Sequence, residues 1–241
     1  EEFSGVWIMA YTTIDDPSAH FQTQIYAGSG SDNKVVTNSG NSDLQPDWIW
    51  IKKRSASGQH VLSDTNRGIL KVLNSNSTAA EDSNSEGEMV KSVQSDGFTL
   101  GDSQAGQGDT NFTSGAAYVA WQWKANGGSR TTFTESGANP GGGYQANTTA
   151  GFSIVDYTGT GSAGTVSHGL GAEPKVLIVK NRDATTDWAV YHRNASSAGN
   201  DSYLELNTAD AVATAGTVWN DTSPSSSVFT VGTNTKTNTD G

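Results

Sequence analysis

Apolar and polar residues alternate in short runs along this chain, which is typical of β-strands rather than of helices. The clearest run is 117–123, in which every second residue falls on the same face. Residues 48–51 are apolar at every position, as expected of a central strand that is covered on both faces. Further strands are predicted at 22–26, 98–100, 153–157, 175–180, 188–191, 203–206 and 228–231. The best helix candidate, residues 208–214, is short.

Four sequence blocks occur twice in the same order. The paired blocks are residues 21–31 and 152–162, 46–54 and 174–182, 73–79 and 204–209, and 97–101 and 228–232. The first pair shares a Phe followed by Tyr-x-Gly-x-Gly-Ser, and the second pair shares a proline, an apolar strand and a Lys-x-Arg ending. Repetition of this kind predicts two domains that are related by internal duplication.

The strands and the repeat together predict an all-β fold of two tandem antiparallel β-sandwich domains, of the jelly-roll or lectin-like kind. Residues 1–20 form a lead-in with an N-terminal strand, and residues 21–125 form the first repeat. Residues 126–151 contain runs of glycine among polar residues and are predicted to be a linker. Residues 152–241 form the second repeat.

The second repeat lacks a counterpart of the aromatic strand at 117–123. After Gly232 the sequence reaches Gly241 without a comparable run. A sandwich that lacks this strand has an unpaired sheet edge beside a slot of apolar surface. We expect either a continuing polypeptide or another chain to supply the strand, and we favour continuation.

Composition supports a folded β protein. Hydrophobic residues make up 34% of the chain and charged residues 16%, while 28 glycines and many Ser, Thr and Asn take up the remainder. These residues are poor helix formers but suit turns. Seven Trp, seven Tyr and seven Phe provide material for cores, which argues against disorder.

The net charge of −11 makes nucleic acid an unfavourable partner, because a surface of this sign repels phosphate backbones. No run of about 18 apolar residues occurs, so membrane insertion is not predicted. The chain has no cysteine, which excludes disulfides and thiolate metal sites.

Catalytic motifs are missing, and we predict that the protein is not an enzyme. The four histidines have no metal-ligand spacing and read as loop or surface residues, and no serine sits in a Gly-x-Ser-x-Gly elbow. No cofactor is predicted. Two Asp-rich loops, residues 102–109 and 234–240, leave a structural calcium ion as an open alternative, although neither has the spacing of an EF-hand.

One group of residues suits a carbohydrate. Trp188, Tyr191, His192 and Arg193 occur in the second repeat alone, near the end of a short strand. An exposed aromatic ring beside an arginine can stack on a sugar and hydrogen-bond to it, so these four are the candidate glycan contact. Ordinary packing is the alternative. Trp48 and Trp50 align with aliphatic residues of the second repeat and are predicted to lie in the core.

The repeated motifs resemble a domain of tailed bacteriophages, especially marine ones. The motifs are Tyr-x-Gly-x-Gly-Ser, Pro-Asp-Trp-Ile-Trp-Ile-Lys-x-Arg, Ser-Asp-Gly-Phe-Thr-Leu-Gly and Ala-Tyr-Val-Ala-Trp-x-Trp in the first repeat. The second repeat adds His-Gly-Leu-Gly-Ala-Glu-Pro at 168–174 and Asp-Trp-Ala-Val-Tyr-His-Arg at 187–193. The resemblance implies a virion structural protein with β-sandwich domains and transfers no catalytic residues.

From this resemblance we expect a tail fibre or surface appendage on the virion exterior, which presents β-sandwich modules for adhesion and host attachment. Its expected partners are other virion proteins, copies of itself in a homo-oligomer, and a host-surface glycan. The alternatives are a capsid decoration protein, a bacterial extracellular adhesin or glycan-binding module, and a depolymerase spike.

Overall fold

The computed structural model describes residues 14–83, 87–102, 109–195 and 200–241. The described chain is built from eighteen β-strands, all paired antiparallel, which confirms the predicted all-β fold. They are accompanied by the 3-10 turn η1 (Pro17–Ala19) and by one four-residue helix, α1 (Gly216–Trp219). Residues 6–11, which the sequence predicts to form the N-terminal strand of the lead-in, lie outside the described residues. None of the helices described here is long and apolar enough to cross a membrane.

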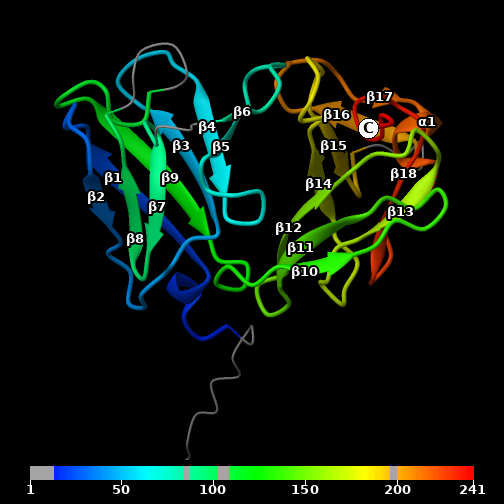
Figure 1. Cartoon of the computed structure of the whole chain (residues 1–241), viewed down its shortest axis with the longest axis horizontal. Helices are drawn as coiled ribbons and strands as arrows, with labels where there is room; N and C mark the ends of the chain where they lie inside the picture. Colours follow the sequence, from blue (N-terminus) through cyan, green and yellow to red (C-terminus); the bar gives the residue numbers. More distant parts are fainter. Residues whose placement is uncertain (1–13, 84–86, 103–108, 196–199) are drawn as a thin grey trace, which may run out of the picture.

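The first half of the chain forms two facing sheets (Figure 1). The larger sheet has the order β1 (Phe21–Ala27), β9 (Ala117–Trp123), β3 (Trp48–Lys53), β4 (His60–Asp64), β5 (Lys71–Asn74) and β6 (Asp82–Ser83). The smaller sheet has the order β2 (Lys34–Thr37), β8 (Gly97–Leu100) and β7 (Val90–Gln94). β9 therefore lies between β1 and β3 and hydrogen-bonds to both.

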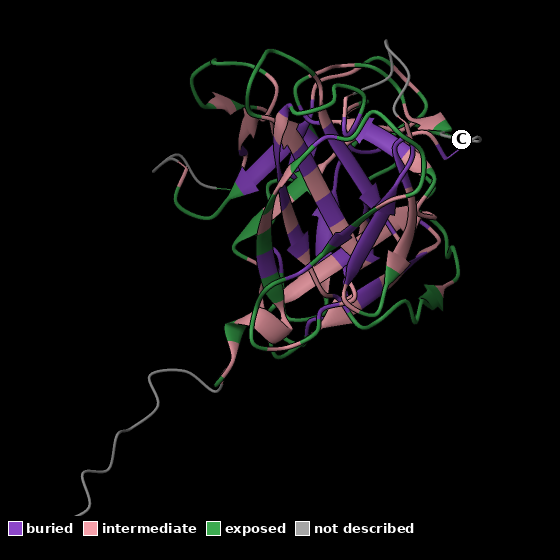
Figure 2. Ribbon diagram, turned by 90° about the vertical axis from the view of Figure 1, so that its left-hand side faces the viewer, coloured by how far each residue is buried: buried purple, intermediate pink, exposed green. Residues whose placement is uncertain are grey.

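Alternation along the strands selects the core of this half. Ile49 and Ile51 of β3 are fully buried and pack with Tyr118 of β9 and Phe98 of β8. Figure 2 shows the buried residues concentrated in the strands and the exposed ones in the loops. Because successive side chains of a strand point to opposite faces, Trp48 and Trp50 lie on the outer face of the sheet.

The second half has shorter sheets. One sheet has the order β10 (Thr131–Phe133), β11 (Gly142–Asn147) and β12 (Phe152–Tyr157), and another has the order β14 (Val176–Val179), β15 (Ala189–His192), β16 (Ser202–Glu205) and β17 (Ala213–Thr214). A third is the pair β13 (Gly164–Ser167) and β18 (Val228–Val231). The core of the second half contains Phe229, Val166 and Val231, and a neighbouring cluster contains Trp219 and Tyr191.

Residues 126–151 were predicted to be a linker, but this segment contains the strands β10 and β11. It is therefore not an unstructured connection. β11 pairs with β10 on one side and with β12 on the other. A tight turn joins β11 to β12: the Gly151 N–H donates to the Asn147 carbonyl at 2.9 Å, and Gly151 has a φ of 68°. Because this segment is rich in glycine, its sequence did not indicate the short alternating strand β11, in which Gln145 is buried.

The segment 208–214, the best but weak helix candidate of the sequence, is not a helix. This segment contains β17, and α1 follows it. Alanines favour a helix locally, but the Thr214 end of the segment pairs with β16 instead. Pairing across the sheet overrides the local preference here.

Seven strands occupy matching places in the two halves. The corresponding strands are β1 and β12, β2 and β13, β3 and β14, β4 and β15, β5 and β16, β6 and β17, and β8 and β18. Neither β7 nor β9 has a counterpart among the described strands of the second half, and β10 and β11 have none in the first half. Without a counterpart of β9, β12 and β14 are each paired on one side only.

Buried hydrogen bonds also recur at matched positions. The Asn111 side chain donates to the carbonyls of Ser31 and Gly101, at 2.8 and 2.7 Å. Asn238 does the same to Ser162 and Gly232, at 2.6 and 2.7 Å. These contacts agree with the repeat seen in the sequence, while a common origin of the halves stays a prediction.

Candidate functional site

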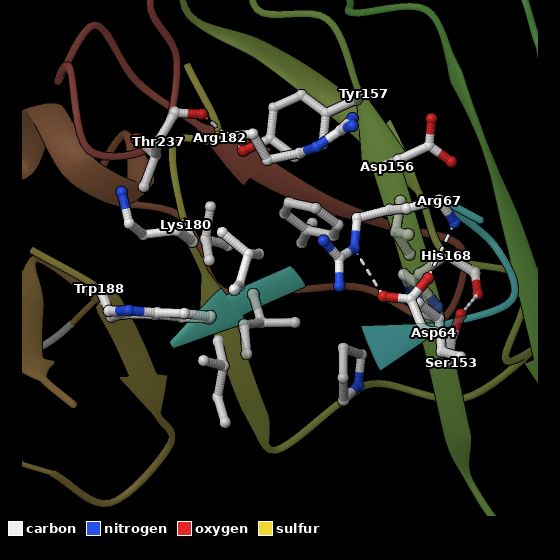
Figure 3. A pocket seen from close by; sticks show the side chains of 18 of the residues that line it. Asp64, Arg67, Ser153, Asp156, Tyr157, His168, Lys180, Arg182, Trp188 and Thr237 are labelled. Atoms are coloured by element: carbon white, nitrogen blue, oxygen red, sulfur yellow. Dashed lines mark hydrogen bonds and ion pairs between the residues drawn. The ribbon is translucent and has the colours of Figure 1, made fainter. Parts of the chain in front are cut away.

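A large cavity lies where the two halves meet and has a volume of about 1140 Å³. One wall is the outer face of the first half, with Trp48, Trp50 and Trp123. The opposite side is formed by β12 and β14 of the second half. Figure 3 shows the view into this cavity, with Tyr157 and Arg182 at one end and Trp188 at the side.

Aromatic rings join the halves along one edge of the cavity. The ring centroids of Trp48 and Trp123 are 4.7 Å apart, and those of Trp123 and Phe152 are 5.9 Å apart with nearly parallel planes. Ring pairs in this distance range add to the stabilisation given by burial alone. Trp48 and Trp50 were predicted to lie in the sandwich core, but the structure places them at this junction, because Ile49 and Ile51 occupy the core face.

Trp188 crosses the junction from the second half. Its side chain is 5% exposed and packs with Leu62 and Leu73 of the first half. Its indole N–H lies within hydrogen-bond distance of the carbonyls of Asn74 and Ser77, at 3.2 and 3.0 Å. Trp188 therefore fastens the halves through both packing and hydrogen bonding.

Glu81 bridges the halves by charge. Arg67 of the first half and Arg182 of the second both donate to its carboxylate, each with a shortest distance of 2.6 Å. The Glu81 side chain is 10% exposed. Arg67 makes a second ion pair, in which its Nε lies 2.6 Å from the Asp64 carboxylate. The backbone N–H of Glu81 also donates to the Arg182 carbonyl, at 2.7 Å.

The environment of Glu81 shifts its pKa. Burial alone would raise the pKa of this carboxyl, but the hydrogen bonds from Arg182 and Arg67 and the charge of Arg67 outweigh burial. The net result is a pKa below its ordinary value of 4.5. Glu81 is therefore ionised at neutral pH, and the ion pair is intact there.

Further polar contacts close the far side of the junction. Asn66 donates to the Asp156 carboxylate at 2.6 Å, and the Thr65 hydroxyl donates to Gln145 at 2.8 Å. Arg130 makes a bidentate ion pair with the same Asp156, with a shortest distance of 2.7 Å. The halves are thus held together by aromatic, ionic and amide contacts at separate places.

The two lysines of the repeated Lys-x-Arg motif have a structural role. Lys52 donates to the carbonyls of Lys53 and Ala56, and Lys180 donates likewise to Asn181 and Ala184. Each lysine therefore closes the loop that follows its strand. Burial lowers the pKa of Lys180 to about 8, although the charge of Asp187 opposes this shift.

Ser153 and His168 are neighbours in the cavity, but they do not form a nucleophile and base. The Ser153 hydroxyl donates to the backbone carbonyl of His168 at 2.6 Å, not to its ring. The ring lies 3.2 Å from the Ser225 carbonyl and accepts from the Leu170 N–H at 3.2 Å. Burial lowers the pKa of His168, which favours a neutral ring in this structural role. The sequence indicated a loop or surface histidine, whereas His168 is buried.

The part of the chain that the structure describes has no cluster of three or more His, Asp or Glu side chains suited to a metal ion. In the second candidate calcium loop, the Asn234 side chain accepts from the Lys236 N–H, and Asn238 is engaged with backbone groups. Of the first candidate loop, residues 103–108 lie outside the described residues.

The four candidate glycan residues are not on one exposed surface. Trp188 faces the junction, whereas Tyr191 is 4% exposed and packs edge-on against Trp219 on the other face of the strand. His192 and Arg193 are exposed, and Arg193 pairs with Glu173 at 2.6 Å. Sugar stacking needs aromatic rings, or a ring and an arginine, on one exposed surface. The structure does not place Trp188, Tyr191 and Arg193 in this way.

Sequence reasoning missed Glu81 and Arg67, which lie in segments without a repeated pattern. Arg182 belongs to the recurrent Lys-x-Arg motif, and Glu81 is the acidic residue that pairs with it. Nothing in the local sequence identifies which of the 25 acidic residues would fill this role.

The family comparison covers both halves together. A single family model, described as a domain of unknown function (DUF7483), matches residues 16–241, and the chain belongs to this family. No curated protein matches the chain. No solved structure matches it either.

Proposed function

We propose that this member of the DUF7483 family is a structural protein of a bacteriophage virion, a tail fibre or surface appendage that presents β-sandwich modules for attachment to the host. The repeated sequence motifs and their resemblance to phage domains support this proposal. The expected partners are other virion proteins, further copies of this chain and a glycan on the host surface.

The observation that carries the proposal furthest is the fastening of the two halves. The shared carboxylate of Glu81, the crossing indole of Trp188 and the contact between Trp123 and Phe152 all link the halves. An appendage must transmit force along its length, and a unit whose parts are locked together suits that role better than two loosely tethered domains. Multiple copies on one particle would raise the avidity for a host surface.

Immunogold electron microscopy tests the location directly. Antibodies raised against the purified chain are applied to virions of a phage that encodes it, and the expected label lies on tail fibres or appendages. Label confined to the capsid would replace the proposal with a decoration protein. Particles without any label would contradict a virion role.

Attachment is tested by competition. Purified chain, added in excess to host cells before the virions, is expected to lower the rate of phage adsorption. A matched control is the same chain after heat unfolding. Adsorption that stays unchanged at saturating chain would contradict host attachment and leave only a structural role on the particle.

A further inference from the structure

The second half has an open slot at the place where β9 runs through the first half. In the first half β9 pairs with β1 from Phe21 opposite Trp123 to Ala27 opposite Ala117, and with β3 from Trp48 to Lys53. The corresponding strands β12 and β14 are the edges of two separate sheets. Both line the large cavity, so the slot is hollow as well as unpaired.

Exposure of apolar side chains marks the same place. Val176 and Ile178 of β14 are 48% and 42% exposed. Their counterparts Trp48 and Trp50 are half-buried, because Trp121 and Trp123 of β9 lie beside them. On the inner side, Val155, Leu177 and Phe229 line the cavity. The slot thus offers apolar contacts on both faces.

The backbone edges of the slot suit a strand. In a β-strand the N–H and C=O groups of successive residues point alternately to the two edges, so half of those in β12 and in β14 face the slot. An exposed row of such groups is a template for one more strand. A strand placed here would join the two sheets into a continuous one, as β9 does between β1 and β3.

An aromatic contact of the first half lacks its partner in the second. Tyr26 lies edge-on to Phe98 and is stacked on Tyr118 of β9, with ring centroids 5.3 Å apart. The matching Tyr157 has the same edge-on contact with Phe229, and its hydroxyl donates to Thr237 at 2.5 Å as that of Tyr26 does to Thr110. No ring among the described residues stacks on Tyr157.

The chain passes the mouth of the slot at Gly241. The Gly115 N–H donates to the Gly28 carbonyl at 2.9 Å, and β9 begins two residues later. The Gly241 N–H donates to the Gly159 carbonyl at 3.3 Å, the matched pair in the second half. Gly241 therefore occupies the position from which a strand would enter in the direction of β9.

We infer that the slot between β12 and β14 is an acceptor for one extended polypeptide strand with the chemistry of β9. The strand runs antiparallel to both neighbours and enters beside Gly241. With the register that β9 has in the first half, the residue of this strand equivalent to Tyr118 lies opposite Tyr157. The residue equivalent to Trp123 lies opposite Phe152 and Val176. Every second side chain fills the core, and the intervening ones cover Val176 and Ile178.

The acceptor is tested by extending the chain after Gly241 with a copy of residues 116–124. The copied strand is expected to raise Tm by at least about 5 °C, because it binds the folded state and not the unfolded one. Hydrogen exchange is expected to slow by at least about tenfold at the amides of β12 and β14 that face the slot. The matched control is the same extension with proline in place of the residues copied from Val119 and Trp121, which cannot complete the ladder.

A free peptide of residues 116–124, flanked by lysines for solubility, forms the second arm. It is expected to protect the same amides more weakly, because tethering raises the effective concentration. Protection by the free peptide but not by the extension would overturn entry beside Gly241. Unchanged exchange at β12 and β14 in both arms, or an equal gain from the proline control, would overturn the acceptor itself.

Discussion

At the scale of single residues, each half is organised around a few buried polar groups rather than around its apolar residues alone. Asn111 and Asn238 each satisfy two carbonyls, and each also accepts a backbone N–H, from Ser29 and Thr160 respectively. A loop without repeating secondary structure needs such partners, because buried backbone groups left unpaired are costly.

The first prediction compares the two asparagines. Asn111→Ala and Asn238→Ala are each expected to lower the free energy of unfolding by about 2–3 kcal/mol, since each leaves buried backbone groups without a partner. Urea unfolding measures the loss. Asn41→Ala, at an exposed position, serves as the control and is expected to change stability by under about 0.5 kcal/mol. Unequal losses at the two sites would argue against matched roles.

The second prediction concerns Glu81. Glu81→Gln is expected to cost about 3 kcal/mol, because two arginines at the junction lose their shared counter-charge. The control is Glu173→Gln, whose ion pairs with Arg193 and Lys175 are exposed and whose loss is expected to cost much less than that of Glu81. Similar losses for the two variants would contradict the bridging role.

The Glu81 pair also predicts a dependence of stability on pH. Its folded-state pKa is lowered below 4.5, so its contribution is present above pH 4.5 and is lost as the pH falls through the folded-state pKa. The stability of Glu81→Gln is therefore expected to fall less steeply below pH 4.5 than that of the parent chain. Chemical unfolding at several acidic pH values measures both slopes. Parallel slopes would show that Glu81 is not the group that titrates.

At the scale of elements, local pattern predicted the strands that carry apolar alternation but not those that depend on a distant partner. The runs at 48–51, 117–123 and 228–231 stand out in the sequence and lie within β3, β9 and β18. β10 and β11 contain glycine and polar residues, and it is the pairing of β10 with β11 and of β11 with β12 that makes them strands. The junction was not predictable for the same reason, since contacts such as Glu81 with Arg182 join segments with no common pattern.

The third prediction tests β11 as a real strand. The amides of residues 144–147 are expected to exchange at least about a hundredfold more slowly than those of an unstructured chain, because β11 has a partner on each side. Gly128 and Ser129, exposed and outside any strand, provide the internal comparison. Equally fast exchange in both segments would restore the interpretation of 126–151 as a linker.

At the scale of the whole molecule, contacts at several places join two similar halves, and one half has an open slot. The family model spans both halves, from residue 16 to residue 241. The large cavity is a property of the junction, because its walls come from both halves.

The fourth prediction follows from the contacts that join the halves. Calorimetry is expected to show one cooperative unfolding transition for the two halves, with equal calorimetric and van't Hoff enthalpies. In Glu81→Gln, with the junction weakened, the transition is expected to broaden or divide. Two well-separated transitions in the unaltered chain would mean that the halves are energetically independent.

The open slot is the central claim, and amide hydrogen exchange of the unaltered chain tests it most directly. The comparison is between β14 and its counterpart β3, which differ in whether a strand covers one edge. We predict that the slot-facing amides of residues 176–179 exchange at least about tenfold faster than the matched amides of residues 48–51. Equal protection of the two strands would contradict the open slot.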